Sequence, residues 1–213
     1  MHPEHGTVSR EVAGAYGGFA FKPFRLIGSN TLPPTMRDNL TVALTGTPGV
    51  GKSTVASMLE AKGWALVSVE DAAREHDCLG ETEVDGAAPV DVHALSEKWA
   101  PPEGKVIVDG HLSHFLDVDA VILLRCSPAM LRNRLSSRAY DEAKVKANVE
   151  WELTAGHWAE LLEFEIELPV LEVDTSERSA DVLVIEVESW ISEGCPSGSL
   201  LETAASAKDW LDD

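Results

Sequence analysis

The sequence has few positive charges, few cysteines and no long hydrophobic run. It contains 17 Lys and Arg residues against 36 Asp and Glu residues, which gives a formal net charge of −19 over 213 residues. Such an excess of carboxylates repels a phosphate backbone, so we expect no general nucleic-acid binding, whereas a small basic pocket or a basic protein partner is compatible with it. No apolar run is long enough to cross a bilayer, and we therefore expect no membrane association.

The three cysteines, Cys78, Cys126 and Cys195, are odd in number and lack the spacing of metal ligands. We interpret them as free thiols in a reducing compartment. The first residues lack the basic start of a secretory signal, so we expect a cytoplasmic protein. An apolar fraction of 44% is ordinary for a soluble protein, and the length suits one α/β core with some tail to spare.

The most informative stretch covers residues 46–54 and reads GTPGVGKST. It matches G-x-x-x-x-G-K-[ST], the phosphate-binding loop (P-loop) of nucleoside triphosphatases and kinases. A β-rich run, residues 40–45, precedes it, and residues 53–62 have the periodicity of a helix. This context argues against a glycine-rich turn that matches by chance. The sequence therefore predicts that the chain binds a nucleoside triphosphate.

The residue types of this stretch suit a polyphosphate and its metal ion. Glycines such as Gly49 and Gly51 allow backbone conformations in which successive N–H groups turn toward anionic oxygens. The helix that follows points its positive end at the same place. Lys52 supplies a charge for the terminal phosphates, and the hydroxyl of Ser53 is a hard oxygen ligand suited to Mg²⁺.

A second group of candidates follows the strand expected at residues 105–110. Asp109 lies at its carboxyl end, where an acid beside a P-loop would meet the water shell of Mg²⁺, and His111 can point to the same side. Alternatively, Asp109 forms a turn before a glycine and His111 is a surface loop residue. We interpret His114 as structural.

Three arginines occupy or follow the helix that Ser127 and Pro128 begin, namely Arg132, Arg134 and Arg138. One interpretation is that they balance carboxylates on the helix surface. The other is that they are forks for phosphates, with Arg138 at a hinge.

The rest of the chain alternates between strand and helix patterns. Further strands are expected at residues 64–69, 120–125 and 168–174; the first is of the buried type, and the second is a continuous apolar run typical of a sheet covered on both faces. Further helices are expected at 70–74, at 90–100, after an N-cap at Asp141 and after 179. Five strands alternating with helices predict an α/β fold of the P-loop class, a doubly wound and mostly parallel sheet flanked by helices.

The two ends of the chain lack such patterns. Residues 1–39 favour a disordered extension, and the sharper hypothesis is that the functional chain begins at Met36. Residues 194–213 form an acidic tail that we expect to be partly disordered or to dock a partner weakly.

Three motifs in order resemble the atypical adenylate kinase family of archaea and the eukaryotic nucleus, whose members also act in maturation of the small ribosomal subunit. They are the P-loop, Val108-Asp109-Gly110-His111, and Arg134-Leu135-Ser136-Ser137-Arg138-Ala139-Tyr140 leading into Asn148. The resemblance extends from about Leu40 to Ile191. It implies a kinase domain at residues 40–193, ATP and Mg²⁺ as cofactors, and transfer of the ATP γ-phosphate to AMP or related monophosphates. It also implies ATPase activity and a role in 16S rRNA maturation.

The resemblance implies roles for single residues as well. Nucleotide binding falls to Gly49, Gly51, Lys52, Ser53 and Thr54, which match the family's loop. Asp109 and His111 match an Asp-x-His motif implicated in Mg²⁺ binding and hydrolysis, so that Ser53 and Asp109 become the metal candidates. Catalysis is assigned to Lys52, Asp109, His111 and Arg138.

Two flanking modules follow from the same resemblance. Arg138 matches the arginine at the start of a short lid, residues 137–147, and also contacts the nucleotide. Residues 68–90 match the monophosphate-binding module with Arg74 as its phosphate contact, and residues 174–176 would lie near the adenine. Ala139 and Glu70 depart from the pattern, because glycine is common at both positions.

Two other functions stay open at this point. One is an ATP-switched assembly factor, in which nucleotide turnover drives release from a basic platform protein of the small ribosomal subunit and kinase activity is incidental. The other is a small-metabolite kinase.

Overall fold

The computed structural model describes residues 39–82, 88–138 and 140–211. The proposed start at Met36 and nearly all of the expected N-terminal extension lie outside the described residues, as does Ala139.

Five strands form one sheet in the order β2-β3-β1-β4-β5, and every neighbouring pair is parallel. The strands are β1 (Leu40–Thr45), β2 (Ala65–Ser68), β3 (Lys105–Asp109), β4 (Ala120–Arg125) and β5 (Val170–Asp174). This confirms the predicted fold class, with a sheet that is parallel throughout.

Eight α-helices and a short 3₁₀ turn connect and cover these strands in the described part of the chain. They are α1 (Lys52–Glu60), α2 (Val69–Glu75), α3 (Val92–Lys98), η3 (Ser113–Phe115), α4 (Pro128–Ser136), α5 (Glu142–Leu153), α6 (Gly156–Glu163), α7 (Ala180–Ser192) and α8 (Leu200–Ala205). None of these helices combines the length and the apolar character that spanning a membrane requires.

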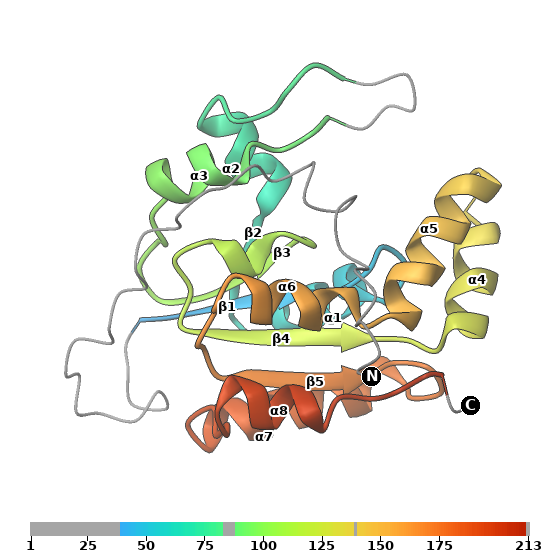
Figure 1. Cartoon of the computed structure of the whole chain (residues 1–213). Helices are drawn as coiled ribbons and strands as arrows, with labels where there is room; N and C mark the ends of the chain where they lie inside the picture. The colour runs from blue at the N-terminus through green and yellow to red at the C-terminus, as the bar shows by residue number, and fades with distance from the viewer. Residues whose placement is uncertain (1–38, 83–87, 139, 212–213) are drawn as a thin grey trace, which may run out of the picture.

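Alternate residues of the strands pack into two separate layers. Val42 and Leu44 belong to a cluster with residues of α1 and α7, whereas Ala43 belongs to a cluster with residues of α2, α3 and α6. Figure 1 shows α6 and α8 in front of the sheet. Because both faces are covered, β4 is buried along its whole length, as its continuous apolar sequence predicted.

Strand β2 differs from the expectation of a buried strand at residues 64–69. Ala65 and Leu66 are exposed, because β2 is an edge strand that pairs only with β3 and is incompletely covered. An apolar run does not distinguish an edge strand from a central one.

Residues 195–211 differ from the partly disordered tail expected from their composition. They contain α8, which begins with a capping box between Ser199 and Glu202. The indole of Trp210 is buried, and the backbone N–H of Lys208 donates a 2.7 Å hydrogen bond to Oε1 of Glu172 on β5. The segment therefore completes the layer that covers one face of the sheet.

The carboxyl ends of the strands converge on the P-loop. Thr45 precedes the loop, Asp109 ends β3 on one side, and Arg125 ends β4 on the other. The helices α2 and α3 stand at one side of this edge and the hairpin of α4 and α5 at the other (Figure 1). The edge formed by the carboxyl ends of the strands, where the connections from adjacent strands diverge, is the usual ligand site of an open α/β sheet.

Candidate nucleotide-binding site

The backbone of the P-loop has the left-handed conformations that the glycines were expected to supply. Gly46, Gly49 and Gly51 have φ angles of 135°, 94° and 113°. A Cβ on Gly46 would lie 2.3 Å from the carbonyl oxygen of Leu124, so only glycine fits this close approach of the loop to β4. Gly51 precedes α1, and no side chain caps the first turn of that helix. The N–H groups of Lys52 and Ser53 have no partner within the helix and can bind an anion, whereas that of Thr54 donates to the carbonyl oxygen of Gly51 at 3.1 Å.

Lys52 lies half-buried over the loop. Its Nζ donates hydrogen bonds to the carbonyl oxygens of Gly46 and Thr47, at 2.7 and 3.1 Å. Burial lowers the pKa of the ammonium to about 8, against the opposing attraction of the carboxylates of Asp109 and Glu152, while the charge of Arg138 lowers it further. The charges of Asp109 and Arg138 therefore both influence the protonation of Lys52.

Asp109 and Ser53 fit the requirements of a magnesium site beside a polyphosphate. Among the described residues, the buried Oδ1 of Asp109 has no hydrogen-bond partner, and burial raises the pKa of this carboxyl although Lys52 lowers it. Ser53 and Thr54 are exposed at the first turn of α1. No cluster of three His, Cys, Asp or Glu side chains in the described chain could hold a metal ion by itself. This donor set suits Mg²⁺, which keeps water and phosphate ligands.

The two histidines after β3 have different surroundings. His111 is exposed, and its backbone carbonyl accepts a 2.9 Å hydrogen bond from the hydroxyl of Thr45. Desolvation of the imidazole, with the charges of Lys52 and His157, lowers its pKa, while the remaining contact with solvent opposes the shift. His114 is buried, and its Nδ1 lies 3.2 Å from the Thr45 hydroxyl. Its position agrees with the structural interpretation.

The arginines of α4 divide into different roles. Arg134 donates to the carbonyl oxygens of Thr175 and Val50, at 2.7 and 3.3 Å, and therefore holds the loop after β5 against the P-loop. Arg132 pairs with Glu142 at 2.9 Å on the surface. Arg138 is exposed beyond the end of α4, and within the described residues no ion pair holds its guanidinium. Of these three arginines, Arg138 is the one whose guanidinium has no protein partner among the described residues that a phosphate would have to displace.

Arg74, the expected monophosphate contact, lies on the exposed face of α2. Its guanidinium pairs with Glu70 at 2.7 Å and with Asp71 at 2.5 Å. A monophosphate would have to compete with these two carboxylates, and one of them stands where the family commonly has glycine.

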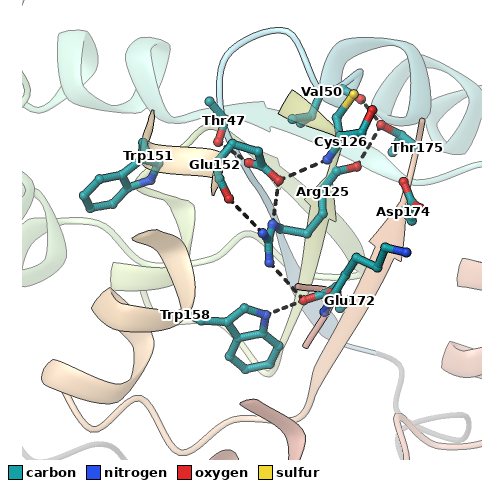
Figure 2. A network of polar contacts seen from close by, with 12 residues as sticks. Thr47, Val50, Arg125, Cys126, Trp151, Glu152, Trp158, Glu172, Asp174 and Thr175 are labelled. Atoms are coloured by element: carbon teal, nitrogen blue, oxygen red, sulfur yellow. Dashed lines mark hydrogen bonds and ion pairs between the residues drawn. The ribbon is translucent and has the colours of Figure 1, made fainter. Parts of the chain in front are cut away.

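A buried polar network beneath the P-loop was missed by the sequence reasoning. Glu152, in the last turn of α5, accepts hydrogen bonds from the hydroxyl of Thr47 at 2.6 Å and from Nε of Arg125 at 2.5 Å (Figure 2). Arg125 also reaches Oε2 of Glu172 at 3.3 Å. The only sequence signals were a cation at the end of an apolar strand and an acid beside the apolar stripe of a helix.

Comparisons with known proteins agree with this geometry. Residues 42–155 match the model of the AAA_18 family, described as an AAA domain. A protein of Archaeoglobus fulgidus named "Putative adenylate kinase" is 41% identical over 150 residues, which cover 70% of this chain and 81% of that one. A protein of the same name from Pyrococcus abyssi is 38% identical over 157 residues, covering 72% and 84%.

The solved structures give a more distant likeness. A gluconokinase from Sinorhizobium meliloti 1021 aligns with a TM-score of 0.47 and 19% identity, covering 80% of this chain and 96% of that one, and this likeness does not bear on function. The family match and the extent of the archaeal alignments are sufficient without it: the chain belongs to the adenylate kinase-like family of P-loop proteins.

Proposed function

We propose that this protein is an adenylate kinase that transfers the γ-phosphoryl group of ATP to AMP or a related nucleoside monophosphate and also hydrolyses ATP. The observation that carries the proposal is the P-loop, whose three left-handed glycines shape a backbone cradle beneath the ammonium of Lys52. The names of the archaeal relatives support the choice of substrate.

In this proposal the site residues bind the phosphates and stabilise their negative charge. The N–H groups of Gly49, Gly51 and Ser53 bind the phosphates, and Lys52 exchanges its two loop carbonyls for phosphoryl oxygens. The hydroxyl of Ser53 and the unpartnered oxygen of Asp109 would hold Mg²⁺, which neutralises the charge that develops on the transferred group when it is bound.

Arg138 would complete the site from the segment between α4 and α5. A guanidinium that closes on the γ-phosphoryl oxygens contributes about 10³-fold or more to the rate in related reactions. Closure of the short lid at residues 137–147 would also remove water, and incomplete closure leaves water as a competing acceptor. This accounts for the ATPase activity in the proposal.

The alternative is an ATP-switched assembly factor for the small ribosomal subunit, in which monophosphate turnover is incidental. Two observations favour keeping it: the net charge of −19 suits a basic protein partner, and Arg74 is already paired with Glu70 and Asp71. Either function uses the same P-loop, so the two differ only in what stimulates turnover.

ATP consumption by the full chain separates these functions. ATP consumption is measured without additions, then with AMP and other monophosphates, and then with a basic platform protein of the small subunit. Strong stimulation by AMP with formation of ADP from both nucleotides supports the kinase. If the platform protein stimulates turnover and AMP does not, the result supports the assembly factor and overturns the kinase as the main activity.

A further inference from the structure

The second residue of the P-loop faces the protein interior. The side chain of Thr47 is fully buried, and its hydroxyl donates a 2.6 Å hydrogen bond to Oε2 of Glu152, which lies 105 residues further along the chain. Figure 2 shows the side chain of Thr47 directed at the carboxylate of Glu152. The hydroxyl of Thr47 is therefore engaged within the protein, where it restrains the loop.

Both carboxylate oxygens of Glu152 are occupied. Oε2 accepts from Thr47, whereas Oε1 accepts from Nε of Arg125 at 2.5 Å and from the backbone N–H of Cys126 at 3.0 Å. Nη2 of Arg125 also donates to the backbone carbonyl of Glu152, at 2.9 Å. One end of the carboxylate is thus fixed to the end of β4, so the other end presents an acceptor to the loop at a defined place.

The opposite flank of the loop is held in a comparable way. The carbonyl oxygen of Val50 accepts from the hydroxyl of Thr175 at 2.7 Å and from Arg134 at 3.3 Å. The loop is therefore attached on both sides of Gly49, which adopts a φ of 94° and is a flexible point of the chain because it has no Cβ. Restraints on both sides of such a point reduce the conformational entropy that remains to be lost on binding.

A buried ion pair is not needed for stability, because apolar residues of similar volume often serve as well. The side chains of Arg125 and Glu152 are each 1% exposed, so their pairing carries a desolvation cost. The contact that an apolar replacement would lose is the acceptor for Thr47, which points to a role in the shape of the loop.

We propose that Glu152 is a positioning residue that acts through Thr47 to hold the P-loop in the conformation that receives the polyphosphate. Arg125 fixes the carboxylate in place and supplies its counter-charge. The inference rests on the proposed function, because it requires that the loop bind ATP. It concerns the affinity for nucleotide and leaves the transfer step to Lys52 and Arg138.

The test compares Thr47→Val with Thr47→Ser in the full chain. Valine keeps the shape of the side chain and removes the donor, so we expect the Kd of Mg·ATP to rise about tenfold, as for loss of a hydrogen bond to a charged group. Serine keeps the hydroxyl, and its Kd should remain within about twofold of wild type. At saturating ATP the kcat of Thr47→Val should change much less than KM.

Thr154→Val is the matched control. Within the described part of the chain, its exposed hydroxyl bonds to the carbonyls of Glu150 and Trp151 on α5 and to no loop residue, so its removal should leave the Kd unchanged. Adding Glu152→Gln to Thr47→Val should weaken binding by less than the product of the two single effects, because both changes act on the same contact. If Thr47→Val does not fold, Thr47→Ala makes the same comparison.

The outcomes separate the inference from the function on which it rests. A folded wild-type chain that does not bind Mg·ATP overturns the proposed function. Wild-type binding with an unchanged Kd in Thr47→Val overturns the positioning role alone. Equal losses in Thr47→Val and Thr47→Ser also overturn it, because side-chain shape and not the hydroxyl would then be responsible.

Discussion

The ammonium of Lys52 donates a 2.7 Å hydrogen bond to the carbonyl oxygen of Gly46, the first residue of its own P-loop. With the second bond to Thr47, this contact folds the lysine over the cradle that it is expected to serve. The carbonyls supply part of the solvation that burial removes, and the carboxylate of Asp109 supplies part of the counter-charge. A bound polyphosphate would replace the two carbonyl contacts of Lys52 with contacts to a charged anion.

The lowered pKa of Lys52 gives a pH dependence with a definite sign. The charged ammonium is present below a pKa of about 8 and is lost as the pH rises through that value, whereas an unperturbed lysine keeps its charge to about 10.5. We expect kcat/KM for ATP to fall with a midpoint near pH 8. Lys52→Arg, if measurable activity remains, should lack this limb because the guanidinium stays charged. A wild-type profile that stays flat to roughly pH 10 would contradict the prediction.

Asp109→Asn should separate activity from stability. The raised pKa of Asp109 means that folding disfavours its charged form, so the ionised carboxylate destabilises the folded state at neutral pH. Asparagine removes this penalty, and we expect an unchanged or higher melting temperature. We also expect the Mg²⁺ concentration for half-maximal turnover to rise about 10- to 100-fold. A variant that melts earlier and keeps its Mg²⁺ dependence would show that Asp109 is only structural.

Arg125→Met should be strongly destabilising. It leaves the carboxylate of Glu152 buried without its counter-charge, and loss of one partner of such a pair costs about 3–5 kcal/mol in the free energy of unfolding. Arg178→Met is the control, because Arg178 and Glu186 are both more than a third exposed and such pairs contribute about 0.2–1 kcal/mol. Urea unfolding measures both, and similar losses would refute the distinction.

Trp210→Ala tests whether residues 195–211 are part of the folded domain. The Trp210 side chain is buried, and removing it should lower the free energy of unfolding by about 3 kcal/mol. Leu211→Ala is the control, since Leu211 is 69% exposed and its change should lie within about 0.5 kcal/mol. Equal and small effects would restore the interpretation of a loosely attached tail.

The sequence predicted the fold because its signals were local. The P-loop, the apolar run of β4 and the N-cap at Asp141 each lie within a few neighbouring residues, and all three are present in the structure. The β2 strand was assigned the wrong exposure, since an apolar run contains no information about which strand lies at the edge. In residues 195–211 the only signal was a weak amphipathic patch around Trp210, which was not enough to predict that its side chain is buried.

The supporting contacts of the site could not be predicted for a different reason. Glu152 joins Thr47 across 105 residues, and Thr175 joins Val50 across 125. Helical periodicity places Val145 and Val149 on the buried face, and it treats a neighbouring acid as solvent-exposed. Only the spatial arrangement shows that Arg125 provides the counter-charge that allows Glu152 to be buried.

The central claim is that the P-loop, with Lys52 above it, binds the polyphosphate of ATP with Mg²⁺. Calorimetric titration of Mg·ATP into the full chain tests it most directly, with Lys52→Met as the matched variant and circular dichroism to establish that both are folded. We expect saturable binding of one nucleotide to wild type and at least about tenfold weaker binding to Lys52→Met. A folded wild-type chain that releases no heat and retains no ATP in equilibrium dialysis would contradict the account.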